Sequence, residues 1–174
     1  PGELVSILQN DRSQTEKPDA QKVPKASIII VNWNTKSVLR GCLSSIQKET
    51  NIPYEIIVVD NNSSDGSIEM LSAEFPNVRT IANTTNRGFA AANNQGISIS
   101  SGDNVLLLNP DTIIVQGAID RMVKWLEQHP NVGGVGCQVM EDDDVVQRTC
   151  FKDPTFLGLT IGQLGLTSLG KYCW

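Results

Sequence analysis

The amino-acid sequence predicts an α/β protein with a mostly parallel β-sheet flanked by helices. Continuous apolar and β-branched runs, of which residues 27–31 are the first, are typical of strands buried on both faces of a parallel sheet. Segments with apolar residues at the 3.6-residue spacing of a helix follow these runs. The two kinds of segment alternate at least four times with short connections, which indicates a doubly wound βαβ series.

The elements follow one another along the chain with clear boundaries. The first helix has either Asn34 or Thr35 available as its N-terminal cap. An acidic turn at residues 141–144 precedes an apolar segment at 145–151, and we interpret this turn as solvated. The expected strands and helices are a strand at 27–31, a helix around 38–46, a strand at 54–60, a helix at 67–75, a strand at 78–82, a helix at 88–100, a strand at 104–108, a helix at 116–128 and a strand at 132–139.

The two ends of the chain differ in composition from the segment between them. Residues 1–25 are mostly polar, so we expect a linker or an N-terminal arm before a domain at 26–154. Residues 155–174 form a Gly- and Leu-rich tail, a candidate for self-association through exposed apolar surface. The tail lacks the basic face of membrane-surface helices, so membrane association is unsupported. The chain begins at Pro1 without a leader, so we expect a fragment, either natural or made in the laboratory.

Composition and charge exclude several classes of function. The 174 residues carry 19 acidic and 14 basic side chains, with a formal net charge of −5. Phosphate backbones are bound by clustered Lys and Arg, so no nucleic-acid partner is expected. The four cysteines show no C-x-x-C spacing, which argues against a zinc ribbon or a thioredoxin-like redox site. Since the chain is not a small secreted scaffold, we interpret them as reduced thiols in a cytoplasmic protein. No apolar run reaches the length of a membrane span.

Polar side chains follow three of the expected strands at the point where each strand ends. Residues 32–34 (Asn-Trp-Asn) follow the first strand, Asp60 ends the second, and residues 109–111 (Asn-Pro-Asp) follow the strand at 104–108. Ligands of open parallel sheets bind outside the carboxyl ends of the strands, so these side chains are expected at one site. The glycine-rich dinucleotide and phosphate-loop motifs are both absent. A bound diphosphate would therefore need a divalent cation, for which Asp111 is the candidate ligand.

Each of these residues also has a purely structural explanation. Asp60 and residues 109–111 can simply form turns, because Asp and Asn favour them. Asp65 can mark no more than the start of a helix, and Trp33 can be a core residue, although its two Asn neighbours favour a cleft. A different α/β class, flavodoxin-like or receiver-like, also stays open at this point. A receiver would require acidic residues at the end of the first strand, where this chain has asparagines.

Four segments resemble, in the order found in the family, the motifs of family 2 glycosyltransferases of GT-A fold. They are residues 27–34 (SIIIVNWN), 56–67 (IIVVDNNSSDGS), 86–96 (NRGFAAANNQG) and 107–112 (LLNPDT). The resemblance covers residues 27–154 and is greatest to the rhamnosyltransferase-like branch, which has Asn-Pro-Asp where other members have Asp-x-Asp. It implies a Rossmann-like GT-A domain that ends before the acceptor-binding half.

The resemblance also implies roles for single residues. Asp60 would hold the base or ribose of the nucleotide, and Trp33 would pack on the base. Asp111 would ligate Mg²⁺ or Mn²⁺ through the diphosphate, and Asn109 replaces an acidic residue, so the site has one charge less than the commoner pattern. The residues implied to bind the nucleotide-sugar are Asn32, Trp33, Asn34, Asp60, Asn62, Asp65, Asn86, Gly88, Asn94, Asn109 and Asp111.

The implied reaction is the transfer of a sugar, with inversion, from a pyrimidine nucleotide-sugar such as dTDP-rhamnose or a UDP-sugar to a glycan acceptor. Such transfer would serve the biosynthesis of surface polysaccharide. The catalytic base of the family lies downstream, beyond Trp174, so no catalytic residue is assigned. The alternative is a nucleotide-binding module that does not turn over because the segment with the base is absent.

Overall fold

The computed structural model describes residues 23–140 and 145–147. Of these, residues 23–135 form one compact unit, and residues from Gly136 onward belong to a second. The predictions for residues 1–22, for the acidic turn at 141–144 and for the tail at 155–174 lie outside the described residues. None of the helices in the described residues combines the length and the apolar character needed to cross a membrane.

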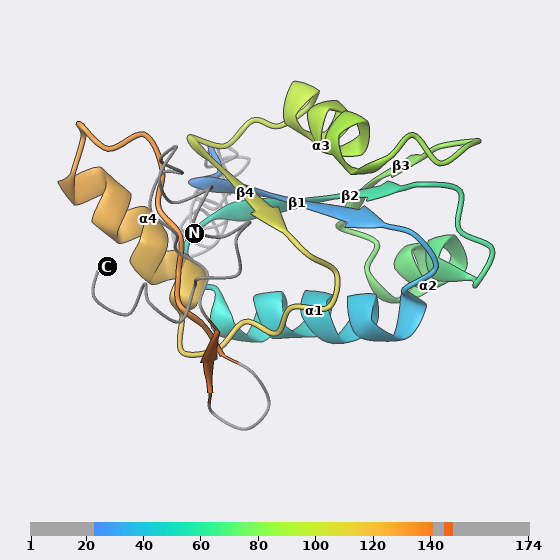
Figure 1. Cartoon of the computed structure of the whole chain (residues 1–174), viewed down its shortest axis with the longest axis horizontal. Coiled ribbons are helices and arrows are strands. Elements are labelled where there is room, and N and C mark those ends of the chain that lie inside the picture. Colours follow the sequence, from blue (N-terminus) through green and yellow to red (C-terminus); the bar gives the residue numbers. More distant parts are fainter. Residues whose placement is uncertain (1–22, 141–144, 148–174) are drawn as a thin grey trace, which may run out of the picture. The chain divides into compact units, whose positions relative to one another are not determined.

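The first unit is built on a sheet of four parallel strands (Figure 1). The strands are β1 (Ala26–Asn32), β2 (Tyr54–Asp60), β3 (Arg79–Ala82) and β4 (Asn104–Leu108). Their order in the sheet is β3-β2-β1-β4, so the chain first builds one side of β1 and then crosses over to the other side. This topology confirms the expected βαβ series.

Helices cover both faces of the sheet. On one face lie α1 (Lys36–Glu49), α2 (Ser67–Glu74) and α4 (Ala118–Gln128), whose buried side chains join a single core cluster with those of the strands. On the other face lies α3 (Phe89–Ser98), which packs through Ala92. Figure 1 shows α3 on one side of the strands and α1 and α2 on the opposite side. The chain therefore has the flanked, mostly parallel sheet that the sequence predicts.

Strand β1 contributes to both cores. Ile28 and Ile30 pack in the cluster on the α1 face, whereas Ile29 packs in the cluster on the α3 face. Burial on both faces explains why this strand is continuously apolar instead of alternating. The α3 helix approaches β1 closely at Gly96, where an added Cβ would lie 2.5 Å from Cγ2 of Ile29. A side chain at this position would force the helix and the strand apart.

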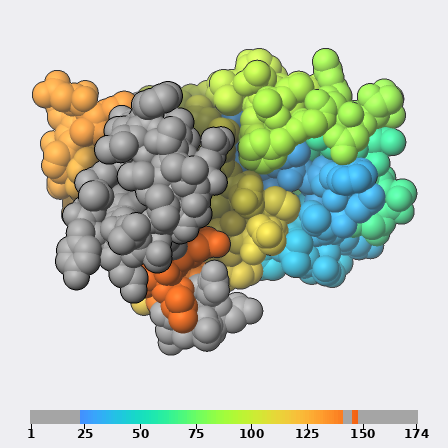
Figure 2. Space-filling model, viewed as in Figure 1, coloured from blue at the N-terminus to red at the C-terminus, as the bar shows by residue number. Residues whose placement is uncertain are grey.

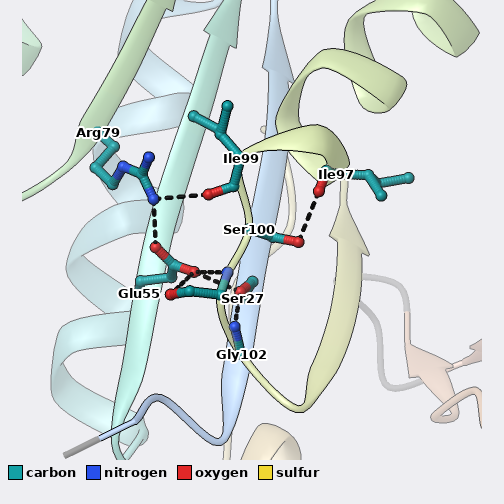
Figure 3. Close-up of polar contacts among 8 residues, drawn as sticks. Ser27, Glu55, Arg79, Ile97, Ile99, Ser100 and Gly102 are labelled. Carbon is teal, nitrogen blue, oxygen red and sulfur yellow. Dashed lines mark hydrogen bonds and ion pairs between the residues drawn. The ribbon is translucent and has the colours of Figure 1, made fainter.

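At the amino ends of the strands, a partly buried carboxylate connects β1, β2, β3 and the turn before β4 (Figure 3). The Glu55 carboxylate accepts hydrogen bonds from Ser27 Oγ at 2.6 Å, from the Ser101 N–H at 2.6 Å and from Arg79 Nη1 at 2.9 Å. Ser27 Oγ in turn accepts a hydrogen bond from the Gly102 N–H at 2.8 Å. Burial of the carboxylate raises its pKa, but these donors outweigh burial and lower the pKa of Glu55 to about 2.

Two of the sequence predictions are wrong. The expected strand at 132–139 is reduced to β5 (Val139–Met140), which pairs antiparallel with β6 (Val146–Gln147). Residues 132–138 contain three glycines and are exposed, and glycine weakens strands because it loses more backbone freedom and has no side chain to pack. The second prediction, the cap of α1, is wrong in part: Thr35 occupies the N-cap position, but the side chain of neither Asn34 nor Thr35 makes a capping hydrogen bond.

Candidate functional site

The carboxyl ends of β1, β2 and β3 lie at the same level of the sheet. Asn32 is the register partner of Asp60, and Asp60 is the register partner of Ala82. The backbone continues this alignment one residue further, since the Asn61 N–H donates to the Asn32 carbonyl at 2.8 Å and the Asn83 N–H donates to the Asp60 carbonyl at 2.9 Å. The loops that follow these strands therefore lie at one edge of the sheet. Strand β4 runs parallel to β1 with Leu108 paired to Ile30, so the turn after it lies toward the same edge, as the sequence predicts.

Asp60 is the most enclosed of the predicted site residues that carry a charge, with 1 % of its surface exposed. Its Oδ1 accepts hydrogen bonds from Asn32 Nδ2 and from Ser63 Oγ, both at 2.6 Å. Its Oδ2 accepts a hydrogen bond from the Ser63 N–H at 2.8 Å. The Asp60 carboxylate is thus held in one orientation by neutral donors from the end of β1 and from the β2–α2 loop. Ser63 is a member of this cluster that the sequence analysis did not single out.

Asn32 lies between Asp60 and the start of α1 and is fully buried. Its Oδ1 accepts a hydrogen bond from Thr35 Oγ1 at 2.6 Å, while its Nδ2 donates to Asp60. Both ends of the amide are therefore occupied within the protein. This arrangement makes Asn32 a support for Asp60, and its predicted place in the lining of the base pocket remains a prediction.

Trp33 and Asn34 form the exposed part of the loop after β1. The Trp33 side chain is a large apolar group at the surface, with 56 % of the residue exposed. Asn34 adopts a left-handed backbone conformation, with φ of 54°. Its N–H donates to Ser63 Oγ at 2.9 Å, and its Oδ1 accepts a hydrogen bond from the Ser64 N–H at 2.8 Å. These bonds join the β1–α1 loop to the β2–α2 loop and leave the indole free to contact a ligand.

Asp65 binds the starts of two helices. Its Oδ2 accepts a hydrogen bond from the Lys36 N–H of α1 at 2.8 Å, and its Oδ1 accepts from the N–H of Ser67 in α2 at 3.1 Å and from Ser67 Oγ at 2.6 Å. Burial raises the pKa of Asp65, but these donors prevail and lower it. Asp65 therefore supplies the side-chain hydrogen bond at the start of α1 that was expected from Asn34 or Thr35. Asn62, another of the predicted site residues, is exposed and has φ of 66°.

The loop between β3 and α3 brings Asn86 and Gly88 to the same edge. Asn86 Oδ1 accepts a hydrogen bond from the Gly88 N–H at 2.8 Å, and Gly88 has φ of +80°, a conformation that L side chains rarely adopt. The Gly88 carbonyl accepts a hydrogen bond from Asn61 Nδ2 at 3.3 Å. Asn94, also predicted to support the nucleotide, lies exposed on α3.

Asn109 and Asp111 lie in a tight turn directly after β4. The Thr112 N–H donates to the Asn109 carbonyl at 3.2 Å, and Pro110 occupies the second position of the turn, where its fixed φ is favourable. Both Asn109 and Asp111 are exposed. Figure 2 shows the segment after β4 (yellow) at the surface, between α3 (green) and the region of β1 and α1 (blue).

A cysteine lies against the inner side of this turn. Cys42 of α1 donates through Sγ to the Asn109 carbonyl at 3.8 Å and is fully buried. Burial, together with the negative charge of Asp111, raises the pKa of the Cys42 thiol to about 12. The thiol therefore stays protonated and serves as a donor that supports the turn.

The turn offers few ligands for a cation. Among the described residues, no group of three or more His, Cys, Asp or Glu side chains is placed to hold a metal ion. One carboxylate, Asp111, and one amide oxygen, that of Asn109, are the hard donors present. Mg²⁺ is commonly held by one or two carboxylates together with substrate phosphates and water. The residues therefore fit a cation that arrives with a diphosphate and not one held by the protein alone.

A parallel α/β sheet with polar loops at the carboxyl ends of its strands is the arrangement of the α/β proteins that bind their ligands at that edge. The family model of glycosyl transferase family 2 matches residues 27–163, so the chain belongs to this family. The fold is that of the GT-A glycosyltransferases. Both the family and the fold that the sequence motifs imply are confirmed.

The matches to individual relatives include most of this chain but only a smaller part of each relative. The uncharacterized glycosyltransferase YwdF of Bacillus subtilis is 38% identical over 104 residues, which are 59% of this chain and 38% of the relative. The O-antigen biosynthesis protein RfbC of Myxococcus xanthus is 30% identical over 146 residues, which are 82% of this chain and 11% of the relative.

A solved structure extends the comparison. The mannosyltransferase PcManGT of Pyrobaculum calidifontis, in complex with GDP-Man and Mn²⁺, matches with a TM-score of 0.60 and 27% identity over 74% of this chain and 39% of that chain. The chain therefore spans less than two fifths of the length of each of these three proteins.

Proposed function

We propose that the protein carrying this chain transfers a sugar from a nucleotide-sugar to a glycan acceptor, and that this chain supplies the nucleotide-binding part. The observation that carries the proposal is the convergence of four loops at the carboxyl ends of the strands. These loops carry Trp33, the segment 86–88 and Asp111 at the edge where β2 ends in Asp60. An aromatic face, an oriented carboxylate, backbone amides and a cation ligand are the groups that a nucleoside diphosphate requires. Family membership and the O-antigen function in the name of RfbC support transfer to a polysaccharide.

The base binds against Trp33 in this proposal. An exposed indole next to a rigid loop gives a large stacking surface, and aromatic stacking is tolerant of base identity. Asp60, oriented by Asn32 and Ser63, would offer the remaining acceptor position of its Oδ2 to the base or ribose, since Oδ1 already accepts two hydrogen bonds within the protein. We infer a pyrimidine nucleotide, UDP or dTDP, from the motifs of the chain. The presence of GDP-Man in PcManGT makes GDP the necessary third ligand in any test.

The diphosphate meets Asp111 and a divalent cation, Mg²⁺ or Mn²⁺. Asp111 and Asn109 would hold the cation together with the diphosphate oxygens, and the Mn²⁺ in PcManGT supports this choice. When bound, the cation would stabilise the negative charge of the leaving diphosphate. The chain's own residues fix the position of the ligand, because the Asn109 turn is closed by Thr112 and supported by Cys42.

The reaction would invert the configuration at the anomeric carbon. In such a displacement, the acceptor hydroxyl attacks from the face opposite the leaving diphosphate, and a carboxylate accepts its proton. We assign no residue of this chain as that base. Cys42 is a buried free thiol, which fits the reducing conditions of the cytoplasm, where we place the protein.

The test is a calorimetric titration of the chain with UDP, dTDP and GDP, each with and without Mn²⁺. The proposal predicts binding of UDP or dTDP that Mn²⁺ strengthens and that exceeds the binding of GDP. Binding of none of the three nucleotides would contradict it. Transfer or hydrolysis of the matching nucleotide-sugar, measured on the same sample, separates an active enzyme from a module that binds without turnover.

A further inference from the structure

Three amide side chains connect the end of β2 to α3. Asn61 follows β2, Asn83 follows β3, and Gln95 lies in α3. Asn83 Nδ2 donates to Asn61 Oδ1 at 3.0 Å and to Gln95 Oε1 at 2.9 Å. Gln95 Nε2 donates back to Asn83 Oδ1 at 2.9 Å, so the two side chains form a reciprocal pair. We call Asn61, Asn83 and Gln95 the amide network.

The amide network contacts the loop before α3 through its backbone. Asn61 has 2 % of its surface exposed, and its Nδ2 donates to the Gly88 carbonyl at 3.3 Å. Its Oδ1 accepts a second hydrogen bond, from the Arg87 N–H at 3.4 Å. Each end of the Asn61 amide therefore binds one end of the peptide segment 87–88. The orientation of Asn61 depends on Asn83, and that of Asn83 depends on Gln95.

We propose that Asn61, Asn83 and Gln95 are positioning residues that hold the loop 84–88 in the conformation that binds the nucleotide. This inference rests on the proposed function, because it assigns the loop to the nucleotide site. A loop fixed before the ligand arrives loses less conformational freedom on binding, so the ligand binds more tightly. The network itself does not contact the nucleotide, and it acts through the backbone of Arg87 and Gly88.

Gln95 is the position at which the network can be changed furthest from the loop. Gln95→Ala removes both hydrogen bonds of the reciprocal pair, whereas Gln95→Glu retains an acceptor for Asn83 Nδ2 and loses one donor. The exchanged pair, Asn83→Gln with Gln95→Asn, keeps the total side-chain length and the number of amides. Gln47→Ala is the matched control, because Gln47 is an exposed glutamine on α1.

Hydrogen–deuterium exchange of the free chain tests the positioning without any ligand. Gln95→Ala should raise the exchange rate in the segment 84–88 by about three- to tenfold, since a lost hydrogen bond contributes of the order of 1 kcal/mol. Gln95→Glu should give a smaller increase, the exchanged pair should return toward wild type, and Gln47→Ala should have no effect. Unchanged exchange at 84–88 in Gln95→Ala would overturn the inference.

Titration with the nucleotide that wild type prefers, in the presence of Mn²⁺, tests the consequence for binding. Gln95→Ala should raise the Kd about tenfold, and the exchanged pair should restore it. In the active protein, the same variant should raise KM for the donor while kcat is retained. Equal Kd values in wild type and Gln95→Ala would overturn the inference. If wild type itself binds no nucleotide, the proposed function and the ligand assigned here are contradicted. The exchange data alone would then show whether the amide network holds the loop 84–88.

Discussion

Asn32 Nδ2 lies 2.6 Å from Asp60 Oδ1, and the two residues are register partners at the ends of β1 and β2. The contact follows from the sheet, because parallel pairing in register places the last residues of adjacent strands side by side. Both residues are buried, so the carboxylate depends on protein donors in place of water. The most enclosed charge of the candidate site is therefore fixed by a neutral amide.

Replacing Asn32 tests this dependence. Asn32→Ala should lower the free energy of unfolding by about 1 to 3 kcal/mol, because it leaves a buried carboxylate with one donor fewer. Asn32→Asp should be worse than Asn32→Ala, since it sets two carboxylates side by side. Urea unfolding followed by circular dichroism measures both, and equal stability of wild type and Asn32→Ala would contradict the role assigned to the amide.

Trp33 should affect binding without affecting stability. Trp33→Ala removes the exposed stacking surface, so the Kd for the preferred nucleotide should weaken by about tenfold or more, in line with about 1–3 kcal/mol per stacked base. Trp33→Tyr should retain most of the affinity. The thermal unfolding midpoint should be unchanged, because much of the side chain is outside the core. Undiminished binding in Trp33→Ala, measured by calorimetry, would remove Trp33 from the site.

Asp111→Ala should abolish the effect of Mn²⁺ on nucleotide diphosphate binding. The reason is that Asp111 is the one carboxylate of the turn after β4, so the cation loses its charged protein ligand. Asp103→Ala is the matched control, because this exposed acid directly precedes β4 at the opposite end of the same strand. Titrations with and without Mn²⁺ give the comparison, and an Asp111→Ala variant that still responds to Mn²⁺ like wild type contradicts the assignment.

Glu55 should make stability depend on pH in the acidic range. Its pKa is about 2 in the folded chain against an ordinary value of 4.5, so the stabilisation is complete above pH 4.5 and is lost as the pH falls from 4.5 toward 2. The shift corresponds to about 3 kcal/mol at most. Urea unfolding at pH 7 and pH 3 should show a smaller difference in Glu55→Gln than in wild type. The same difference in both proteins would argue against the cluster of Figure 3 as the cause.

Gly96 should tolerate no side chain. Gly96→Ala places a Cβ within 2.5 Å of Ile29 Cγ2, which is attached to a branched and rigid carbon, so the strand and helix must separate. We expect a loss of about 1 to 3 kcal/mol in the free energy of unfolding. Gly133→Ala is the control, since an added Cβ there meets nothing within 4 Å. Equal stability of the Gly96→Ala and Gly133→Ala variants would show that α3 has room to move.

The sequence predicted β1 and β2 because these strands are largely buried on both faces and therefore read as uninterrupted apolar runs. The strand at 54–60 was predicted with the bounds that β2 has. The strand at 132–139 failed because valines alternating with glycines resemble a strand in composition but lack packing partners. The edge of the site was predictable as well, since the ends of parallel strands coincide.

The internal contacts of the site were not predictable in this way. Asn83 and Gln95 are twelve residues apart on different elements, and their reciprocal pairing appears only once β3 and α3 are placed. Asp65 was predicted to shape a pocket or to mark the start of one helix, but that its carboxylate binds the starts of two helices appears only in the structure. A sequence gives the type of a polar side chain and its place on an element, while its partner depends on the orientation of loops that are far apart in the chain.

The shared carboxylate of Asp65 has a mechanical consequence. An ordinary N-cap serves its own helix, so the first turn of each helix frays independently of its neighbours. Here the first turns of α1 and α2 are anchored to the two oxygens of one side chain, and protonation or displacement of that side chain loosens both at once. The β1–α1 loop with Trp33 and the β2–α2 loop with Ser63 are therefore tied to each other through Asp65, in addition to the bonds of Asn34 to Ser63 and Ser64.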